Sequence, residues 1–369
     1  MSIAPAATPR TPADWRERYS HENLQKWRHV CDPLADNAAA QLKRAKPSAM
    51  LAQLEELARA GNADCRRYLD VTAQVPAWVD WQLVEHGRRV CLAFSAARST
   101  GLLASLMEGY SLSRAAHVLV ATGRLNQDVA RRLQETGQMS HNMNAPDGMR
   151  PGGVAHRHIL EVRLLHAMVR RYVRDRHWDV ALYDEPVNQE DMAFTVIEFD
   201  FLAARGMDRL GAKLSAEDRR AVHHLWRYAA WLHGVHEDLI THTPEEEEFQ
   251  YEAIRAHQRH PNGESRALAE AVLTGIAGQP PLYLNERALR ALARAMLDDG
   301  LNDFYGLMPD RLADAGVALL KQLNRTLTFA HYRVPGAARL SEAMHFGMAR
   351  RALNANLGSE EQRAFRGMA

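Results

Sequence analysis

The sequence predicts an all-α fold, and three observations support this prediction. Long segments rich in Ala, Leu, Arg and Glu carry apolar residues at the three-and-four spacing of a buried helix face. Alternating apolar and polar runs bounded by hairpin turns, the pattern of strands, are missing from the sequence. Proline and glycine gather between the helical segments rather than inside them. The expected architecture is therefore a set of packed helices joined by loops.

The first half of the chain contains helices of two kinds. Weak apolar stripes predict helices over 11–30 and 48–60, so residues 1–75 are expected to form an accessory helical layer. Stronger stripes predict the next three helices, over 79–98, 124–138 and 152–176. The run NAPDGMRPGG separates the last two of these and is long enough to reverse the chain, so they are expected to be neighbours.

The second half is punctuated in the same way. The run YDEPVNQ precedes the first predicted helix of this half, and AGQPP falls between two later ones. Thr243 and Glu246 form a capping box with Pro244 at the first helical position, so the run EEEE at 245–248 begins a helix rather than a metal site. The predicted helices span 189–205, 215–240, 245–258, 264–277, 283–298 and 309–329.

Composition narrows the classes of partner. A chain of 369 residues that is 46% hydrophobic can bury a large core, in one large domain or two. Lys and Arg number 46 against 45 Asp and Glu, and the net charge of +1 provides no electrostatic reason to expect nucleic acid or an anionic membrane as the main partner. A small apolar molecule remains a candidate.

The N-terminal run and the cysteines indicate the compartment. The run MSIAPAATPRTPADW lacks the charged and apolar segments of a secretory signal, and no apolar run is long enough to span a bilayer, so we expect a cytoplasmic protein without a membrane span. Cys31, Cys65 and Cys91 lie far apart and form no CxxC or CxxCH motif. They are expected to be ordinary thiols, which argues against disulfides, a zinc knuckle and covalently attached haem.

One histidine stands inside the apolar stripe of a predicted helix. His166 falls among the apolar residues of that stripe, which are Ile159, Val162, Leu165, Val169 and Val173. Arg163 shares its face three residues earlier, and Arg132 and Thr136 share a face of the preceding helix. The two polar pairs could therefore meet across a helix interface and enclose a pocket.

Spacing alone leaves a structural interpretation open for each of these residues. A single histidine on an apolar face is more often a core residue bonded to a carbonyl than a ligand. Arg163 and Arg132 could pair with surface acids, and Thr136 could bond to its own helix backbone.

Four segments resemble one family, the rubber oxygenases with the latex-clearing proteins and the related fungal ER-bound oxygenases. The resemblance covers roughly residues 75 to 300. VPAWVDWQLVEHG at 75–87 and PVNQEDMAFT at 186–195 are similar to two family segments. Between them, Arg132 to Thr136 matches an Arg-x-x-x-Thr element, and Arg163 to His166 matches an Arg-x-x-His element 30 residues further on.

The resemblance implies a haem protein. The expected fold is a single large all-α bundle of globin-like character that encloses a haem pocket in residues 76–369, with 1–75 as the N-terminal layer. Haem b would be held non-covalently, with His166 as the axial ligand of its iron. An imidazole within an apolar stripe suits that role, because the porphyrin faces need hydrocarbon walls. Arg163 would hold a propionate or orient the groups around the iron.

The resemblance also implies a reaction. Arg132, Glu135 and Thr136 would line the distal side, where dioxygen binds. Some family members carry a lysine that caps the iron at the position of Glu135, so a carboxylate here departs from the pattern and could serve as a base. The expected activity is an oxygenase reaction on a carbon–carbon double bond of an apolar isoprenoid or fatty small molecule. A haem-binding or peroxidase-like protein without this turnover, and a helical protein that has lost the cofactor, are the alternatives.

Other histidines are rival ligands. His233 with His236 is the most plausible rival, because His-x-x-His would place two imidazoles on one helix face. The pairs His156/His158 and His223/His224 could also contribute to a metal cluster. A carboxylate-bridged di-metal bundle needs two Glu-x-x-His motifs, and the sequence contains one, Glu342 to His345. The oligomeric state is left open.

Overall fold

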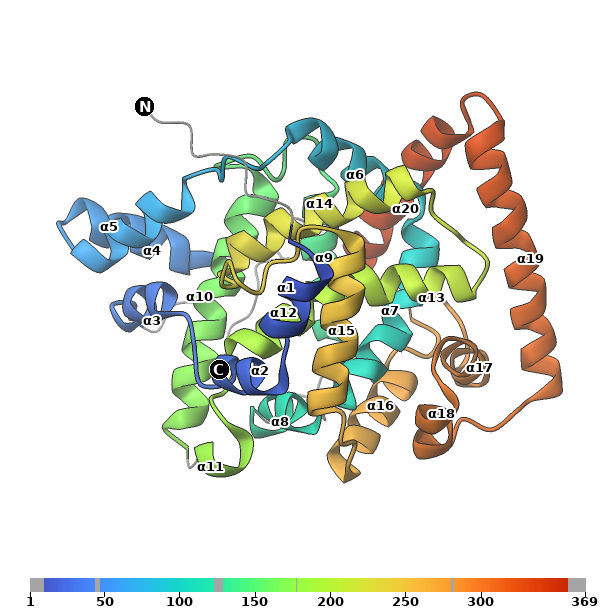
Figure 1. Ribbon diagram of the computed structural model, residues 1–369. Helices are drawn as coiled ribbons and strands as arrows, with labels where there is room; N and C mark the ends of the chain where they lie inside the picture. Colours follow the sequence, from blue (N-terminus) through green and yellow to red (C-terminus); the bar gives the residue numbers. More distant parts are fainter. Residues whose placement is uncertain (1–9, 44–46, 123–128, 177, 280–281, 358–369) are drawn as a thin grey trace.

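The computed structural model describes residues 10–43, 47–122, 129–176, 178–279 and 282–357. Within these ranges all regular structure is helical and no strand occurs, so the all-α prediction is confirmed (Figure 1). A long helix, α10, runs through the molecule, with α3 to α5 on one side of it and α1 and α2 on the other, near α15.

The N-terminal layer contains more helices than the sequence suggested. The predicted helix 11–30 is broken at Ser20, whose side chain accepts a hydrogen bond from the Asn23 amide and so begins a second helix. Two short helices were not predicted, because each spans only two or three turns. The five helices are α1 (Pro12–Arg18), α2 (His21–Trp27), α3 (Pro33–Ala40), α4 (Pro47–Arg59) and α5 (Ala63–Thr72).

The predicted helix 79–98 is two helices that meet at a sharp bend. α6 (Trp81–Ala93) and α7 (Ser95–Tyr110) diverge by 86° around Phe94. No single helix in the described ranges is long and apolar enough to cross a bilayer, and this bent pair meets the requirement only when both members are counted together. Both helices carry many fully buried residues. α8 (Ser113–Ala121) follows them.

Two neighbouring helices carry the residues of the predicted pocket. α9 (Val129–Met143) and α10 (Val154–Arg174) pack against each other, as expected from the loop between them. Gly153 precedes α10 at a point without room for a side chain, because a Cβ there would lie 2.5 Å from the Gly148 carbonyl oxygen. That same carbonyl accepts hydrogen bonds from the first amides of α10, at Ala155 and His156.

The helix predicted over 189–205 contains a π-helical turn. The segments are α12 (Gln189–Ile197), η1 (Glu198–Leu202) and α13 (Ala203–Arg209), and the short α11 (Val180–Tyr183) precedes them. α14 (Ala216–His233) is shorter than the predicted 215–240, because Gly234 adopts φ +82° and ends the helix.

The C-terminal helices pack on the opposite side of the molecule from α3 to α5 (Figure 1). Thr243 accepts a hydrogen bond from the Glu246 amide at the start of α15, which confirms the predicted helix start. The remaining helices are α15 (Pro244–Gln258), α16 (Gly263–Gly275), α17 (Glu286–Met296), α18 (Asp299–Tyr305), α19 (Arg311–Arg333) and α20 (Ala337–Leu357).

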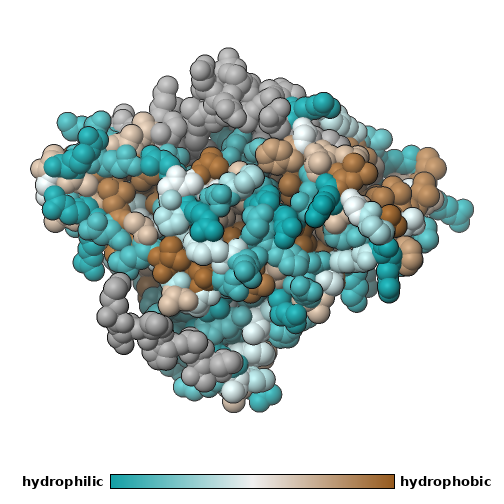
Figure 2. Space-filling model, turned by 90° about the horizontal axis from the view of Figure 1, so that it is seen from above, coloured by the Kyte–Doolittle hydropathy of each residue, from teal (hydrophilic) through white to brown (hydrophobic). Residues whose placement is uncertain are grey.

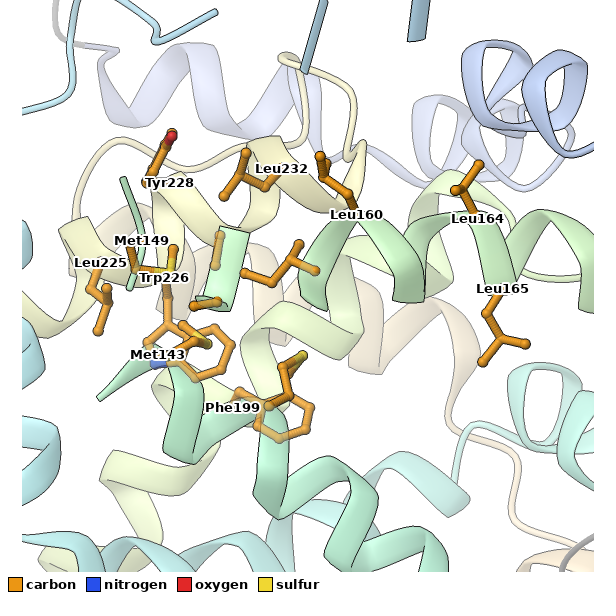
Figure 3. Close-up of a cluster of buried hydrophobic side chains, with 14 of the residues drawn as sticks. Met143, Met149, Leu160, Leu164, Leu165, Phe199, Leu225, Trp226, Tyr228 and Leu232 are labelled. Atoms are coloured by element: carbon orange, nitrogen blue, oxygen red, sulfur yellow. The ribbon is translucent and has the colours of Figure 1, made fainter. Parts of the chain in front are cut away.

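The largest apolar cluster surrounds α10 and α14. It joins residues of α3, α4 and α5 to residues of α6, α9, α10 and α14, so the N-terminal layer shares a core with the main bundle. Two further clusters lie around α7 with α16 to α18, and around α12 with α15. The first cluster, drawn in part in Figure 3, contains the surroundings of His166.

Candidate active site

His166 lies in the middle of α10 and has no hydrogen-bond partner for its Nδ1 atom within the described part of the chain. The ring keeps some accessible surface, yet burial lowers its pKa to about 4, with the positive charge of Arg170 acting in the same direction. The imidazole is therefore neutral at physiological pH and retains a nitrogen lone pair that can bind a metal.

A second unpaired histidine lies beside it. The ring centroids of His166 and His233 are 6.3 Å apart, and their planes are inclined by 27°. The Nδ1 atom of His233 is also buried without a partner among the described residues. Burial, and then the neighbouring His166 and Arg163, lower the pKa of His233 to about 3. Two neutral imidazoles thus lie together in an apolar region, which is unusual unless a further group binds them.

Arg163 sets the position of this pair. Its Nε and Nη2 atoms donate to Asp32 Oδ2 and Oδ1, at 2.6 and 3.0 Å, in a buried bidentate ion pair. Its Nη1 atom donates to the carbonyl of Leu232 at 3.4 Å, at the end of α14. Arg163 therefore ties the N-terminal layer and α14 to α10.

Gly234 makes this arrangement possible. A Cβ atom at this position would lie 2.5 Å from Arg163 Cζ and 2.5 Å from Asp32 Oδ2, and the φ of +82° disfavours any side chain. The chain can leave α14 directly over the ion pair only because this residue is glycine. His233 is consequently held one residue before the turn, next to His166.

The two roles expected for Arg163 differ in how well this geometry suits them. Its guanidinium is already engaged by Asp32 and by the Leu232 carbonyl, so the structure shows a protein partner where we expected a propionate. The other expected role, orienting the groups around the metal ligand, stays a prediction.

The residues expected on the distal side belong to α9. Glu135 and Thr136 are half-buried in this helix, which packs against the helix of His166. The side chain of Arg132 lies outside the described residues. Their roles on the distal side therefore stay a prediction.

Large apolar side chains belong to the same cluster as Leu165 and Ala167, the chain neighbours of His166. Phe199 stacks on Trp226 with 5.2 Å between ring centroids, and Met143 from α9 joins the same cluster (Figure 3). Trp226 Nε1 and the Tyr228 hydroxyl are buried there without a partner among the described residues. The region thus combines hydrocarbon walls with several unsatisfied polar atoms.

A row of side chains along α10 is only partly covered. His158, Val162, His166 and Val169 follow one another at helical spacing and keep accessible surface, although most residues around them are buried. His158 accepts a hydrogen bond from Asn142 Nδ2 at 2.9 Å, if its Nδ1 is unprotonated, and burial lowers its pKa to about 4. Desolvated but accessible side chains are what a flat apolar group would cover.

These residues fit a haem. The site provides a neutral imidazole with an unpaired nitrogen, apolar walls and a partly uncovered helix face, which are the features that a non-covalent haem requires. No thiolate is present among these residues, since Cys65 and Cys91 are buried elsewhere in the apolar cluster as the ordinary thiols that we expected.

A second group of titratable residues contains His223, which we had considered with His224 for a metal cluster, and two acids that we had not predicted there. Asp200 of η1, His223 of α14 and Glu247 of α15 bring one ligand atom each within 4.8 Å of the others. His223 Nδ1 lies 3.0 Å from Asp200 Oδ2 and 3.3 Å from Glu247 Oε2. Arg219 donates to both carboxylates, at 2.5 and 2.7 Å. We call these four residues the ion cluster.

The charges of the ion cluster balance without a metal. Burial disfavours the imidazolium form of His223, but hydrogen bonds to Asp200 and Glu247 outweigh it and raise its pKa to about 9. Two acids therefore face one guanidinium and one imidazolium, and burial with the neighbouring Asp200 raises the pKa of one of them, Glu247, to about 7. Glu247 comes from the EEEE run that we interpreted as a helix start, and it turns inward from the first turn of that helix. A cation would have to displace Arg219 from both acids.

The other rival histidines have ordinary roles. His236 does not share a helix face with His233, because α14 ends between them, and its ring packs on Trp27 at 4.5 Å. His156 Nε2 lies 3.0 Å from the Thr72 carbonyl oxygen, and His224 accepts a hydrogen bond from the Asp80 amide at 2.9 Å. His345 Nδ1 lies 3.1 Å from the Ser341 hydroxyl.

Comparisons with known proteins agree with the sequence resemblance. Residues 89–331 match the family model described as the catalytic domain of ER-bound oxygenase mpaB/B′ and rubber oxygenase. The rubber oxygenase of Streptomyces sp. (strain K30) is 25% identical over 301 residues, which are 76% of this chain and 70% of that protein. The latex clearing protein LCP in its closed state shares the fold, with a TM-score of 0.65 and 19% identity over 88% of this chain and 91% of that one. The chain therefore belongs to the family of ER-bound and rubber oxygenases.

Proposed function

We propose that this protein is a haem b-dependent oxygenase that uses dioxygen to oxidise or cleave a carbon–carbon double bond of an apolar isoprenoid or fatty small molecule. Membership of an oxygenase family supports the reaction class. The observation that carries the proposal on this chain is the neutral, unpaired imidazole of His166, in an apolar cluster and beside a partly uncovered helix face.

Each group of residues would have a distinct task. His166 would provide the axial nitrogen, and the ion pair of Arg163 with Asp32 would hold the helix that carries it. The apolar side chains Met143, Phe199 and Trp226 would exclude water and accept a hydrocarbon chain. Bound haem would supply the oxygen-activating chemistry. Glu135, Thr136 and Arg132 of α9 would act on the distal side, with the Glu135 carboxylate able to accept a proton.

One observation favours a second function. Because His233 lies beside His166 and is equally unpaired, both imidazoles would be able to bind the same iron. Such a protein would have no open position for dioxygen, and it would act as an electron carrier or sensor. This is the haem protein without oxygenase turnover that the sequence left open.

Haem content and absorption spectra test the first function. The protein would be produced with a haem precursor and compared with His166→Ala, His233→Ala and the matched control His236→Ala, whose ring is exposed at the surface. We expect near one haem b per chain in the parent and the control, and a loss of haem in His166→Ala. Full haem with an unchanged spectrum in His166→Ala would rule out the assignment.

The same variants distinguish the two functions. If His233 leaves the iron free, His233→Ala keeps its haem, and the parent consumes oxygen with an unsaturated terpenoid or fatty substrate. If both histidines bind iron, the parent has a six-coordinate low-spin spectrum and His233→Ala converts it to a five-coordinate one. Glu135→Lys tests the distal side, because a lysine facing the iron would produce a six-coordinate ferric spectrum.

A further inference from the structure

The outward face of α19 carries an apolar stripe that no described residue covers. Leu312 is 70% exposed, Leu319 72%, Leu323 52% and Leu327 57%, and Val334, just after the helix, is 51% exposed. Leu312, Leu323 and Val334 are spaced eleven residues apart, about three helical turns, and the other two fall on the same side. A helix of 23 residues is about 34 Å long, so the stripe is as long as a small domain is wide.

The opposite face of α19 already supplies the contacts that hold the helix. Val317 is its one fully buried residue, and Asn324 Nδ2 donates to the Leu210 carbonyl at 2.9 Å. The helix packs on the body through this face, along which it also contacts α17 and α20. The stripe does not contribute to this packing.

The charges beside the stripe are all positive. Arg311, Arg325 and Arg333 are exposed along one flank, and none of them has an acidic partner within the described part of the chain. Asp314, the acid of this helix, is turned to the body and is paired with Arg294 at 2.6 Å. The whole chain has a net charge of only +1, but the surface around the stripe is both basic and apolar.

The apolar surface continues beyond the helix. Met308 before α19 is 77% exposed, and Leu340 and Met344 of α20 are 63% and 54% exposed. Within α19, Phe329 on the arginine side is 66% exposed. In Figure 2 the apolar side chains, in brown, gather at the right-hand edge, over the end of the hairpin that α19 forms with α20. We call this surface, with the stripe and its arginine flank, the α19 face. Contiguous apolar patches of this kind mark interaction sites.

We propose that the α19 face binds the surface of an anionic lipid bilayer. An amphipathic helix with leucines on one side and arginines along the flank lies in the plane of a membrane interface, with its apolar side among the acyl chains. Lipid phosphates would satisfy the three arginines. Pairing with a second copy would place the arginines of two chains side by side without any exposed acid on either helix, so charge disfavours that occupant.

Docking on a bilayer would place the enzyme next to its proposed substrate. An apolar substrate partitions into a bilayer, and an enzyme that docks there would collect it without passage through water. That consequence depends on the proposed function, whereas the docking itself depends only on the α19 face. Lipid binding by a protein prepared without haem therefore tests the docking separately from the oxygenase.

Vesicle binding is the direct test. The full chain would be sedimented with vesicles of phosphatidylcholine alone and of phosphatidylcholine mixed with phosphatidylglycerol. The double variant Leu319→Asp, Leu323→Asp removes the centre of the stripe, and Arg311→Gln, Arg325→Gln, Arg333→Gln removes the flank. The matched control is Leu182→Asp, an exposed leucine (60%) in α11, remote from α19 in Figure 1. Circular dichroism would verify that each variant keeps its helical content.

We expect the parent and the control to sediment with the anionic vesicles, and to bind them more weakly at high salt. The leucine variant should bind these vesicles at least tenfold more weakly than the parent. Each arginine removed should weaken binding roughly fivefold. Failure of the parent to bind, or binding of the leucine variant that equals the parent's, would overturn the proposal. A parent that is dimeric by light scattering and becomes monomeric in the leucine variant would overturn it too, in favour of a second copy as occupant.

Discussion

At the scale of single residues, Gly234 decides how the two unpaired histidines meet. It ends α14 in a left-handed conformation and leaves space for the ion pair of Arg163 with Asp32 directly beneath the turn. His233 precedes it, and His166 lies one helical turn beyond Arg163. The proximity of the two imidazoles thus follows from one missing side chain and one buried ion pair.

The first prediction concerns this glycine. Gly234→Ala should lower the free energy of unfolding by about 2–4 kcal/mol, because the new Cβ meets both partners of the ion pair in addition to the cost of a positive φ. The matched control is Gly306→Ala, at φ +66° with no atom within 4 Å, which should cost only about 1 kcal/mol. Urea denaturation measures both values. Equal losses in the two variants would contradict the role assigned to Gly234.

The second prediction concerns pH. The pKa values of His166 and His233 are lower in the folded protein than the ordinary value near 6.5, so below pH 6.5 the unfolded chain binds more protons than the folded one. Stability should therefore fall as the pH decreases from about 6.5 to about 4. Each pKa unit of difference corresponds to about 1.4 kcal/mol per group.

Denaturation of the haem-free protein at several pH values measures this effect. Desolvation also lowers the pKa values of His158, His224 and His242, so replacing His166 and His233 by leucine should reduce the slope of stability against pH without abolishing it. The exposed control His236→Leu should keep the full slope. A double variant with the slope of the parent would show that these imidazoles are not desolvated.

Sequence patterns identify some of these residues and not others. His166 is visible because a single polar residue interrupts a regular apolar stripe. Asp32 is 131 residues away from Arg163, and nothing in the local sequence indicates that they pair. His233 was considered as a pair with His236 on one helix face. Gly234 lies between them and ends the helix, so this glycine was the signal that the two histidines do not share a face.

At the scale of elements, the sequence predicted most helices but missed where they bend. Phe94 separates α6 from α7, and no proline or glycine marks the break, since both sides keep helical composition. The π-helical turn η1 is equally invisible, because one wider turn leaves propensity unchanged. Short helices such as α3 and α5 escape periodicity, which needs more than two turns to be evident. In each case tertiary packing determines the geometry.

The π-helical turn places Asp200 in the ion cluster, which joins η1, α14 and α15. The third prediction is that Asp200→Asn lowers the free energy of unfolding by roughly 3–5 kcal/mol, because it leaves the buried imidazolium of His223 and the half-buried guanidinium of Arg219 without this acid. Glu247→Gln should cost less, since burial and the neighbouring Asp200 raise the pKa of Glu247 to about 7 and its carboxyl is already partly neutral. Thermal unfolding at pH 7 compares the two, and a larger loss in Glu247→Gln would contradict the assigned charges.

At the scale of the whole molecule, the sequence suggested an accessory layer over residues 1–75 and a haem-binding domain over 76–369. Packing unites the two parts. Ala35, Leu51 and Tyr68 of the layer belong to the same apolar cluster as Leu160 and Leu164 of α10. Tyr68 also donates a hydrogen bond to the Leu160 carbonyl at 2.9 Å. Weak apolar stripes in the layer reflect short helices that need the main bundle to bury their apolar sides: α3 and α4 pack on α10, whereas α1 and α2 pack on α15.

The last prediction follows from the buried charges at this boundary. A fragment of residues 76–369 would expose the apolar side of α10 and would leave Arg163 without Asp32 and Arg170 without Asp36. Unpaired arginines at a newly exposed apolar surface cannot be stabilised by local rearrangement, so the fragment should lack a cooperative thermal transition. The full chain should unfold in one transition whose calorimetric and van't Hoff enthalpies agree. A fragment that melts cooperatively, or a full chain with two separate transitions, would instead establish the layer as an independent domain, and His166 would then be held by the main bundle alone.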